Sequence, residues 1–327
     1  MNKVTEMADR PGTWSPFRRR WTRREWLGGV TLLAFGSTGL GRPEELSAAE
    51  TKLVEAVRAQ TAKAGIKDVG VDLSDHFVGV GNAPSAFRIK ALKLCESLAA
   101  TFLQHFKAKG FEVALSRDRL VVVTLADRES YAAFKGEEVD ESEGGYFDVA
   151  GNRLAVFDFL NGRGKAAGNV RTMNTFTLVH ESIHQLTFNT GLLDPQADVP
   201  DAVSEGLATY GELWQLGRPQ IGQKNSLRLA ELKNPSPGDG GWIPVAELLT
   251  DDDLFSDGKT EQRAYAEAWL LIYDLMQTKA GAKKLQAYLK TIRSRRDAGH
   301  RVATAEEALG DLGKLDDGLK KRIRTLR

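Results

Sequence analysis

Two histidines and a glutamate, His180, Glu181 and His184, form the pattern H-E-x-x-H inside an apolar stretch. On a helix, residues four apart lie one turn apart on the same face, so both imidazoles can point at one metal ion. Glu181 is too close along the chain to be a natural third ligand, but it is well placed to hold a metal-bound water. This combination predicts a zinc hydrolase with Glu181 as general base. The alternative is a core helix with two hydrogen-bonded histidines and a solvated glutamate.

A third ligand is expected on a second helix. Pro200 and Asp201 are typical of a helix start, and apolar residues recur after them at helical spacing. The first helix has a natural end at Asn189-Thr190-Gly191. Two helices joined by such a short connection can return Glu205 to the histidine pair. Catalytic zinc usually takes three protein ligands and a water.

These motifs resemble a known superfamily of enzymes. H-E-x-x-H, a gap of about twenty residues and then E-G-x-A-x-Y-x-E, from Glu205 to Glu212, are similar to the gluzincin zinc metallopeptidases. The local sequence of residues 180–192 and 204–210 further resembles a mostly exported bacterial family, domain-of-unknown-function family 1570.

The resemblance assigns roles to individual residues. It implies that His180, His184 and Glu205 are the zinc ligands and that Glu181 is the base. Glu212 matches a second acidic position in the family, where it would orient a ligand histidine. The alternative for Glu212 is a surface glutamate on a helix.

A later helix contains a candidate for stabilising the oxyanion. The segment from Tyr265 to Met276 resembles an aminopeptidase helix whose first tyrosine binds the oxyanion of the tetrahedral intermediate. Any hydrolase of this kind needs a donor aimed where negative charge develops. Tyr210 is the alternative donor, and a merely packed Tyr265 is the other reading. The G-x-M-E-N motif that captures a free amino terminus in aminopeptidases is absent from the sequence, so aminopeptidase specificity is not implied.

The first 45 residues are expected to be a signal segment and not part of the fold. Arg18–Arg20 and Thr22–Leu27 precede a glycine-bearing, moderately apolar stretch, Gly28–Leu40, that is too short for a comfortable membrane span. Thr22-Arg23-Arg24-x-Trp26-Leu27 resembles a twin-arginine export signal. We therefore expect export to the periplasm or cell envelope, with membrane contact only through this segment. An arginine-rich tail with a weak hydrophobic anchor is the alternative.

The charge balance bears on the class of partner, and the cysteine content bears on the core of the fold. Residues 1–49 hold 8 of the 45 basic and 5 of the 44 acidic residues, which leaves a net charge of about −2 on the rest. This balance argues against nucleic acid as a partner. The single cysteine, Cys95, lies in an apolar helical pattern and is expected in the core.

The periodicity of the chain predicts an α+β fold. The clearest strand is Leu120–Leu125, residues 69–80 are extended, and Gly144–Val149 and Arg153–Phe159 flank a Gly-Asn hairpin signal. Helices are expected over 46–64, 85–109, 128–134, 261–278, 280–293 and 315–326. We expect a signal segment over 1–45, an N-terminal part with a mixed sheet over 46–165, and a zincin-like helical catalytic part over 166–327. By the gluzincin resemblance, the exposed edge strand that pairs with the substrate would be Leu154–Phe159.

The sequence thus predicts an exported zinc metallopeptidase acting on a peptide or protein. In this mechanism zinc lowers the pKa of a bound water toward about 7, Glu181 transfers its proton to the leaving amine, and Tyr265 supports the oxyanion. Two alternatives stay open: a binding module on a retained peptidase scaffold, and a zinc hydrolase acting on a non-peptide bond.

Overall fold

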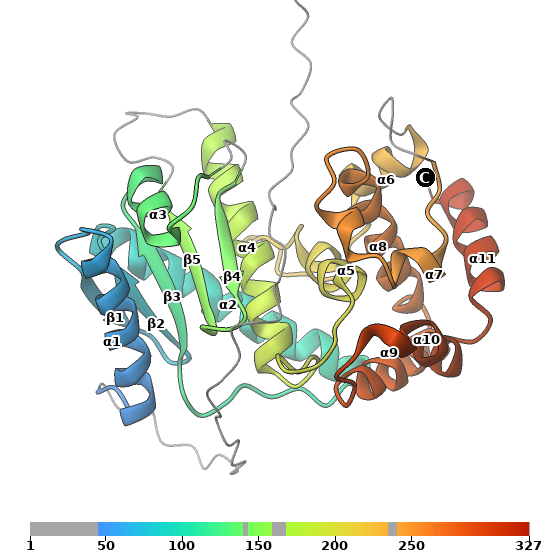
Figure 1. The fold of residues 1–327 in the computed structure, drawn as a ribbon, viewed down its shortest axis with the longest axis horizontal. Coiled ribbons are helices and arrows are strands. Elements are labelled where there is room, and N and C mark those ends of the chain that lie inside the picture. The colour runs from blue at the N-terminus through green and yellow to red at the C-terminus, as the bar shows by residue number, and fades with distance from the viewer. Residues whose placement is uncertain (1–44, 140–142, 159–167, 235–240, 327) are drawn as a thin grey trace, which may run out of the picture.

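The computed structural model describes residues 45–139, 143–158, 168–234 and 241–326, with side chains in the third range from 175 onward. A sheet with its covering helices forms one half of the molecule and a cluster of helices forms the other (Figure 1). The predicted α+β class is confirmed. The predicted signal segment lies outside the described residues, apart from Glu45. No helix in the described ranges is long and apolar enough to cross a membrane.

The sheet has five strands in the order β1 (Gly70–Leu73), β2 (Phe77–Gly81), β3 (Leu120–Leu125), β5 (Arg153–Phe157) and β4 (Gly145–Asp148). The three central strands are parallel, and the two outer strands run antiparallel to their neighbours. Every residue of β3 is buried, which explains its unbroken apolar sequence, because helices cover both faces of the sheet.

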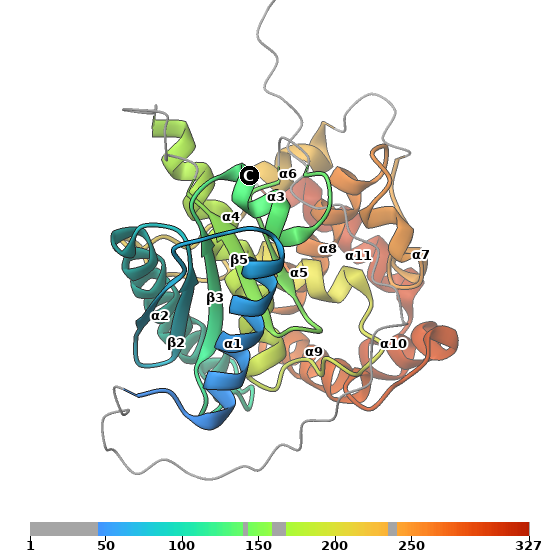
Figure 2. The same ribbon diagram turned by 60° about the vertical axis from the view of Figure 1, so that its left-hand side comes forward.

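Each face of the sheet has its own helices. Helices α1 (Ala48–Lys63) and α3 (Arg128–Lys135) pack on one face, and α2 (Ser85–Ala108) and α4 (Gly168–Asn189) pack on the other (Figure 2). Alternate residues of β3 divide between two apolar clusters: Val121 and Val123 belong with α1 and α3, whereas Leu120 and Val122 belong with α2 and α4.

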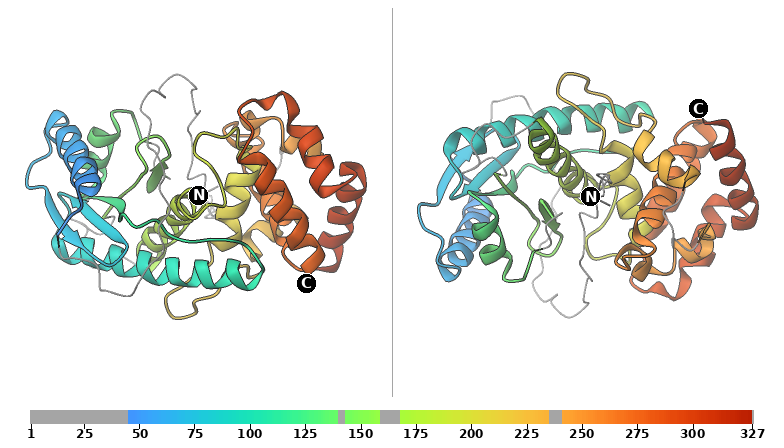
Figure 3. Two further views of the ribbon diagram at one scale, coloured as in Figure 1. Left: turned by 90° about the horizontal axis from the view of Figure 1, so that it is seen from below. Right: turned by 90° about the horizontal axis from the view of Figure 1, so that it is seen from above.

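The second cluster continues into the other half of the molecule. It reaches from β2 through α4 to α5 (Asp201–Gly211), α8 (Glu261–Leu275) and α9 (Lys279–Ile292). Seen from below and above, α2 runs along the molecule from the sheet toward these helices (Figure 3). At its end, the Nζ atom of Lys109 donates to the carbonyl of Met276, and Gln286 donates to the carbonyl of Lys109.

Shorter helices complete the C-terminal half. They are α6 (Ser226–Lys233), α7 (Val245–Leu248), α10 (Arg301–Leu309) and α11 (Leu312–Thr325), with single 3₁₀ turns at Asp252–Phe255 and Ala298–His300. The long helices predicted near 261–278, 280–293 and 315–326 are confirmed. Periodicity did not predict the short helices α6, α7 and α10, although α3, which also has 8 residues, was predicted.

One expectation about the sheet is wrong. The Gly-Asn hairpin forms, but β5 is hydrogen-bonded on both sides, to β3 and to β4. The exposed edge next to α4 is therefore β4 (Gly145–Asp148) and not the segment from Leu154 to Phe159, of which Phe159 lies outside the described residues. A hairpin signal identifies two neighbouring strands, but it does not say which of them is outermost.

Candidate metal centre

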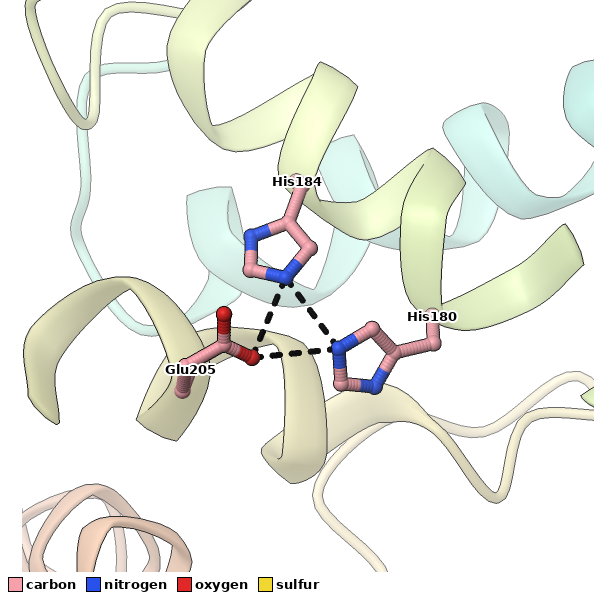
Figure 4. Close-up of side chains that lie close together, drawn as sticks. All are labelled: His180, His184 and Glu205. Atoms are coloured by element: carbon pink, nitrogen blue, oxygen red, sulfur yellow. Dashed lines mark hydrogen bonds and ion pairs between the residues drawn. The ribbon is translucent and has the colours of Figure 1, made fainter. Parts of the chain in front are cut away.

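The two motif helices bring three ligand atoms together as predicted. His180 and His184 lie one turn apart on α4, and Glu205 faces them from α5 (Figure 4). The Nε2 atoms of the two histidines are 3.1 Å apart, and the Oε2 atom of Glu205 lies 3.2 Å from each. Both histidines are buried. These three residues form a group that could hold a metal ion.

The spacing of the three atoms matches a tetrahedral centre. Ligands bound at about 2.0 to 2.1 Å with tetrahedral angles lie about 3.3 Å from one another. The three separations here, 3.1, 3.2 and 3.2 Å, approach that value and are nearly equal.

The chemistry of the three atoms also favours a positive charge among them. The Nδ1 atom of His180 faces the Oε2 atom of Glu212 at 3.3 Å, and a carboxylate can only accept, so the hydrogen of a neutral His180 resides on Nδ1. Its Nε2 atom then presents a lone pair to a second nitrogen and a carboxylate oxygen. Such a convergence of electron pairs is repulsive unless a positive charge lies among them, either a metal ion or the proton that a charged His180 carries.

The close approach of these groups shifts the pKa values of His180 and Glu205. Burial lowers the pKa of His180, but Glu205 and Glu212 outweigh it and raise the pKa to about 9. Burial raises the pKa of Glu205, but the two histidines reverse this effect and hold its pKa well below the usual range. The carboxylate therefore stays ionised, as a metal ligand must be.

Gly206 sets how closely α5, and so Glu205, approaches the rest of the helical half. A Cβ atom at this position would lie 2.7 Å from the carbonyl oxygen of Ala268 on α8 and 2.8 Å from Ile272. The E-G pair of the motif therefore combines a ligand with the close helix contact that positions it.

At the far end of α4, Gly191 has a φ of +87°, which ends the helix as predicted.

Glu212 lies behind His180 and not on the surface, in agreement with the role implied by the resemblance. Its carboxylate accepts two hydrogen bonds of 2.9 Å from Arg228 and one of 2.5 Å from Asn225. Burial alone would raise the pKa of Glu212, but Arg228 and His180 lower it to about 2. A charged, fixed carboxylate thus holds the ring orientation of His180.

Glu181 lies beside the three ligand atoms and is not one of them. Its side chain is buried, and its Oε1 atom has no hydrogen-bond partner among the described residues. Burial raises the pKa of Glu181 to about 8, opposed by His180 and reinforced by Glu205. The backbone N–H of Phe147, on edge strand β4, donates to this carboxylate. The unused oxygen can accept a proton when the carboxyl group is ionised, a state that a cation held by the three neighbouring atoms would favour.

The two candidate tyrosines lie in different surroundings. The hydroxyl of Tyr210 is 3.0 Å from the Nε2 atom of His105 on α2, in a cluster that does not include the ligands. Tyr265 is 1 % exposed. Burial raises the pKa of Tyr265 well above its usual value, and the carboxylates of Glu205, Asp201 and Glu181 add to that rise. Of the two tyrosines, Tyr265 is the one whose pKa is raised by the carboxylates of the centre.

Part of the chain matches a known family of proteins. Residues 174–297 match the model of a family described as protein of unknown function, DUF1570. The resemblance to that family is thereby confirmed over a segment that runs from before His180 to beyond Tyr265. No curated protein matches the chain. The wider resemblance to gluzincins stays a prediction.

Sequence reasoning missed three residues around the centre: Ser204, Asn225 and Arg228. The hydroxyl of Ser204 lies 3.1 Å from the Nδ1 atom of His184, and its position next to Glu205 could have suggested this contact. Asn225 and Arg228 follow an irregular segment after Glu212, and no periodic pattern links them to the motif helices. Only the tertiary packing of α6 brings them to Glu212.

Proposed function

We propose that the protein is a zinc-dependent peptidase that hydrolyses peptide bonds with Glu181 as general base. One observation carries the proposal: two imidazole nitrogens and a carboxylate oxygen, at nearly equal separations, lie next to a buried carboxylate with an unused oxygen atom. Structural zinc sites use four protein ligands, whereas catalytic sites use three and keep one position open. The described residues supply three.

Zinc is the metal that fits this donor set best. Two imidazoles and one carboxylate in tetrahedral array are typical of catalytic zinc, whereas magnesium and calcium prefer six or more oxygen ligands. When bound, zinc supplies Lewis acidity toward water and toward a carbonyl oxygen.

The residues of the chain would then move and stabilise charge. Glu181 accepts the proton of the attacking water and passes it to the leaving amine. The hydroxyl of Tyr265 donates a hydrogen bond to the oxygen that becomes negative. Glu212 keeps the Nδ1–H group of His180 in place, so that the ring presents Nε2 to the metal.

The edge strand β4 supports a peptide as the substrate. It is the outer strand of the sheet on the side of α4, and an extended peptide can add to such an edge as a further strand. Its Phe147 N–H group already contacts Glu181, so a chain paired along β4 would pass the base.

Metal content and cleavage of a general protein substrate test the proposal. Protein purified without chelators should contain about one zinc per chain, cleave unfolded casein, and lose activity when His184→Ala removes a ligand. Zinc without cleavage would favour the binding module. Zinc with hydrolysis of esters but not of peptides would favour a non-peptide hydrolase. A chain that binds no zinc would refute the proposal.

We further propose that the protein is exported to the periplasm or cell envelope through Arg23 and Arg24. Replacing both arginines by lysine keeps the charge but removes the arginine pair of the twin-arginine motif. The variant should accumulate in the cytoplasm, as measured by cell fractionation. Export equal to wild type would contradict the twin-arginine assignment.

A further inference from the structure

We propose that Arg228 is a positioning residue that couples the metal ligand His180 to Tyr265. The inference rests on the proposed function for the role of Tyr265, whereas its effect on His180 concerns metal binding alone. Arg228 lies on α6, an element separate from the helices that carry His180 and Tyr265. Its guanidinium group contacts the surroundings of both.

The contact toward His180 runs through Glu212. The Nε and Nη2 atoms of Arg228 donate to the two oxygens of Glu212, both at 2.9 Å. Such a fork fixes the carboxylate in position and in plane, which a single bond does not. The Oε2 atom of Glu212 then accepts from the Nδ1 atom of His180 at 3.3 Å.

The contact toward Tyr265 is made through the face of its ring. The guanidinium carbon lies 5.3 Å from the ring centroid, within the range of a cation–π interaction. Arg228 therefore holds the ring in place and brings a positive charge close to a phenol surrounded by carboxylates. A donor positioned in this way needs less rearrangement when negative charge develops on the substrate.

Asn225 strengthens the connection between α6 and the centre. Its Oδ1 atom caps α6 by accepting from the backbone N–H groups of Leu227 and Arg228. Its Nδ2 atom donates to Glu212 at 2.5 Å. The same side chain thus fixes the beginning of α6 and the carboxylate, so that Arg228 approaches Glu212 from a defined direction.

The chain offers a matched control in Arg263. It is 6 % exposed, against 8 % for Arg228, and it donates to a buried carboxylate, Glu267, at 2.5 Å. Its guanidinium lies 5.8 Å from the ring centroid of Trp242. Arg263 therefore also has a buried carboxylate partner and a ring contact, but Glu267 accepts from the backbone N–H of Ile243, whereas Glu212 accepts from His180. Substitution of either arginine should cost similar stability.

The first test measures zinc affinity by competition with a chromophoric chelator. Arg228→Gln should weaken zinc binding by about 10- to 100-fold, whereas Arg263→Gln should bind like wild type. In a double-mutant cycle, adding Arg228→Gln to Glu212→Gln should weaken binding by less than about 3-fold more, because both act through one contact. Equal zinc affinity in wild type and Arg228→Gln, or an equal loss in Arg263→Gln, would overturn the coupling.

Arg228→Lys keeps the test decisive if the glutamine variant does not fold. Lysine retains the charge but cannot form the two parallel bonds, so its zinc affinity should lie between those of wild type and the glutamine variant. A lysine variant that binds zinc like wild type would contradict the positioning role.

The second test addresses Tyr265 at saturating zinc. Arg228→Gln should lower kcat by about 10-fold with a much smaller change in KM, and this effect should shrink in a Tyr265→Phe background. Equal effects in both backgrounds would contradict the coupling to Tyr265. Wild-type protein that binds zinc but cleaves no peptide would instead refute the proposed function, and the zinc measurements would still decide the link to His180.

Discussion

Replacement of Glu181 by glutamine should remove activity and at the same time make the protein more stable. Glutamine keeps the shape of the side chain and removes its negative charge and its ability to accept a proton. Glu181 is not one of the three ligand atoms, so zinc content should stay near that of wild type. The rate of peptide cleavage should fall by about 10²- to 10⁴-fold, the contribution of a general base.

The gain in stability follows from the cost of burying the carboxylate. Burial raises the pKa of Glu181 from 4.5 to about 8. A carboxyl group with a raised pKa contributes stability below the unfolded pKa, and this contribution is lost as the pH rises through the folded value. At pH 7 the difference corresponds to about 3 kcal/mol, so Glu181→Gln should exceed wild type by up to that amount. The gain should vanish near pH 4.

Urea unfolding of chelator-treated protein at pH 4, 5.5 and 7 measures this effect, because bound metal would itself alter the pKa of Glu181. The matched control is Glu50, a buried carboxylate with a lowered pKa that accepts from the Nη1 atom of Arg119 at 3.1 Å. Glu50→Gln should destabilise the protein by about 3 kcal/mol and leave activity unchanged. If Glu181→Gln is less stable than wild type at pH 7, the burial cost assigned to the carboxylate is wrong. If the variant cleaves at the wild-type rate, the assignment of Glu181 as base is wrong.

Four further substitutions separate the roles of the remaining residues. Glu205→Gln removes a charged ligand, so zinc affinity and activity should fall together, which metal analysis beside a cleavage assay would show. Tyr265→Phe should retain zinc and lose about 10²- to 10³-fold in kcat, whereas Tyr210→Phe should keep most of its activity; the opposite order would favour Tyr210 as donor. Burial, reinforced by Lys109, lowers the pKa of His105 to about 4, so stability from neutral His105 should be lost as the pH falls from about 6.5 toward 4. Thermal unfolding should show this loss, up to about 2 kcal/mol after allowance for partial exposure, in wild type and not in His105→Gln.

The features that the sequence predicted well depend on local order along the chain. The histidine pair follows from helical spacing, and the return of Glu205 follows from two helices joined by a short connection. Strand β3 was placed at its observed bounds, because a short run of β-branched residues is specific when helices bury both sides.

The features that the sequence did not predict depend on packing between distant segments. Strand order is one example, since β5 pairs with β3 across about thirty residues and so displaces β4 to the edge. The environment of Glu212 is another. Its partners are Arg228, from a helix of 8 residues, and Asn225, the residue that caps that helix, and the local sequence carries no sign of a ligand histidine.

The long helix α2 gives the molecule a property that matters for how it could be divided. Its 24 residues span about 36 Å, and its apolar face shares one core with α4 on the sheet side and with α8 and α9 beyond. A fragment limited to the family-matched segment would therefore be made without the surface on which α4 rests. Two separately produced pieces, 45–158 and 168–326, should each be poorly soluble and should reassemble when they are expressed together. The two pieces are therefore suited to a split reporter, in which activity returns only when the helices of the candidate metal site pack again on their supporting sheet.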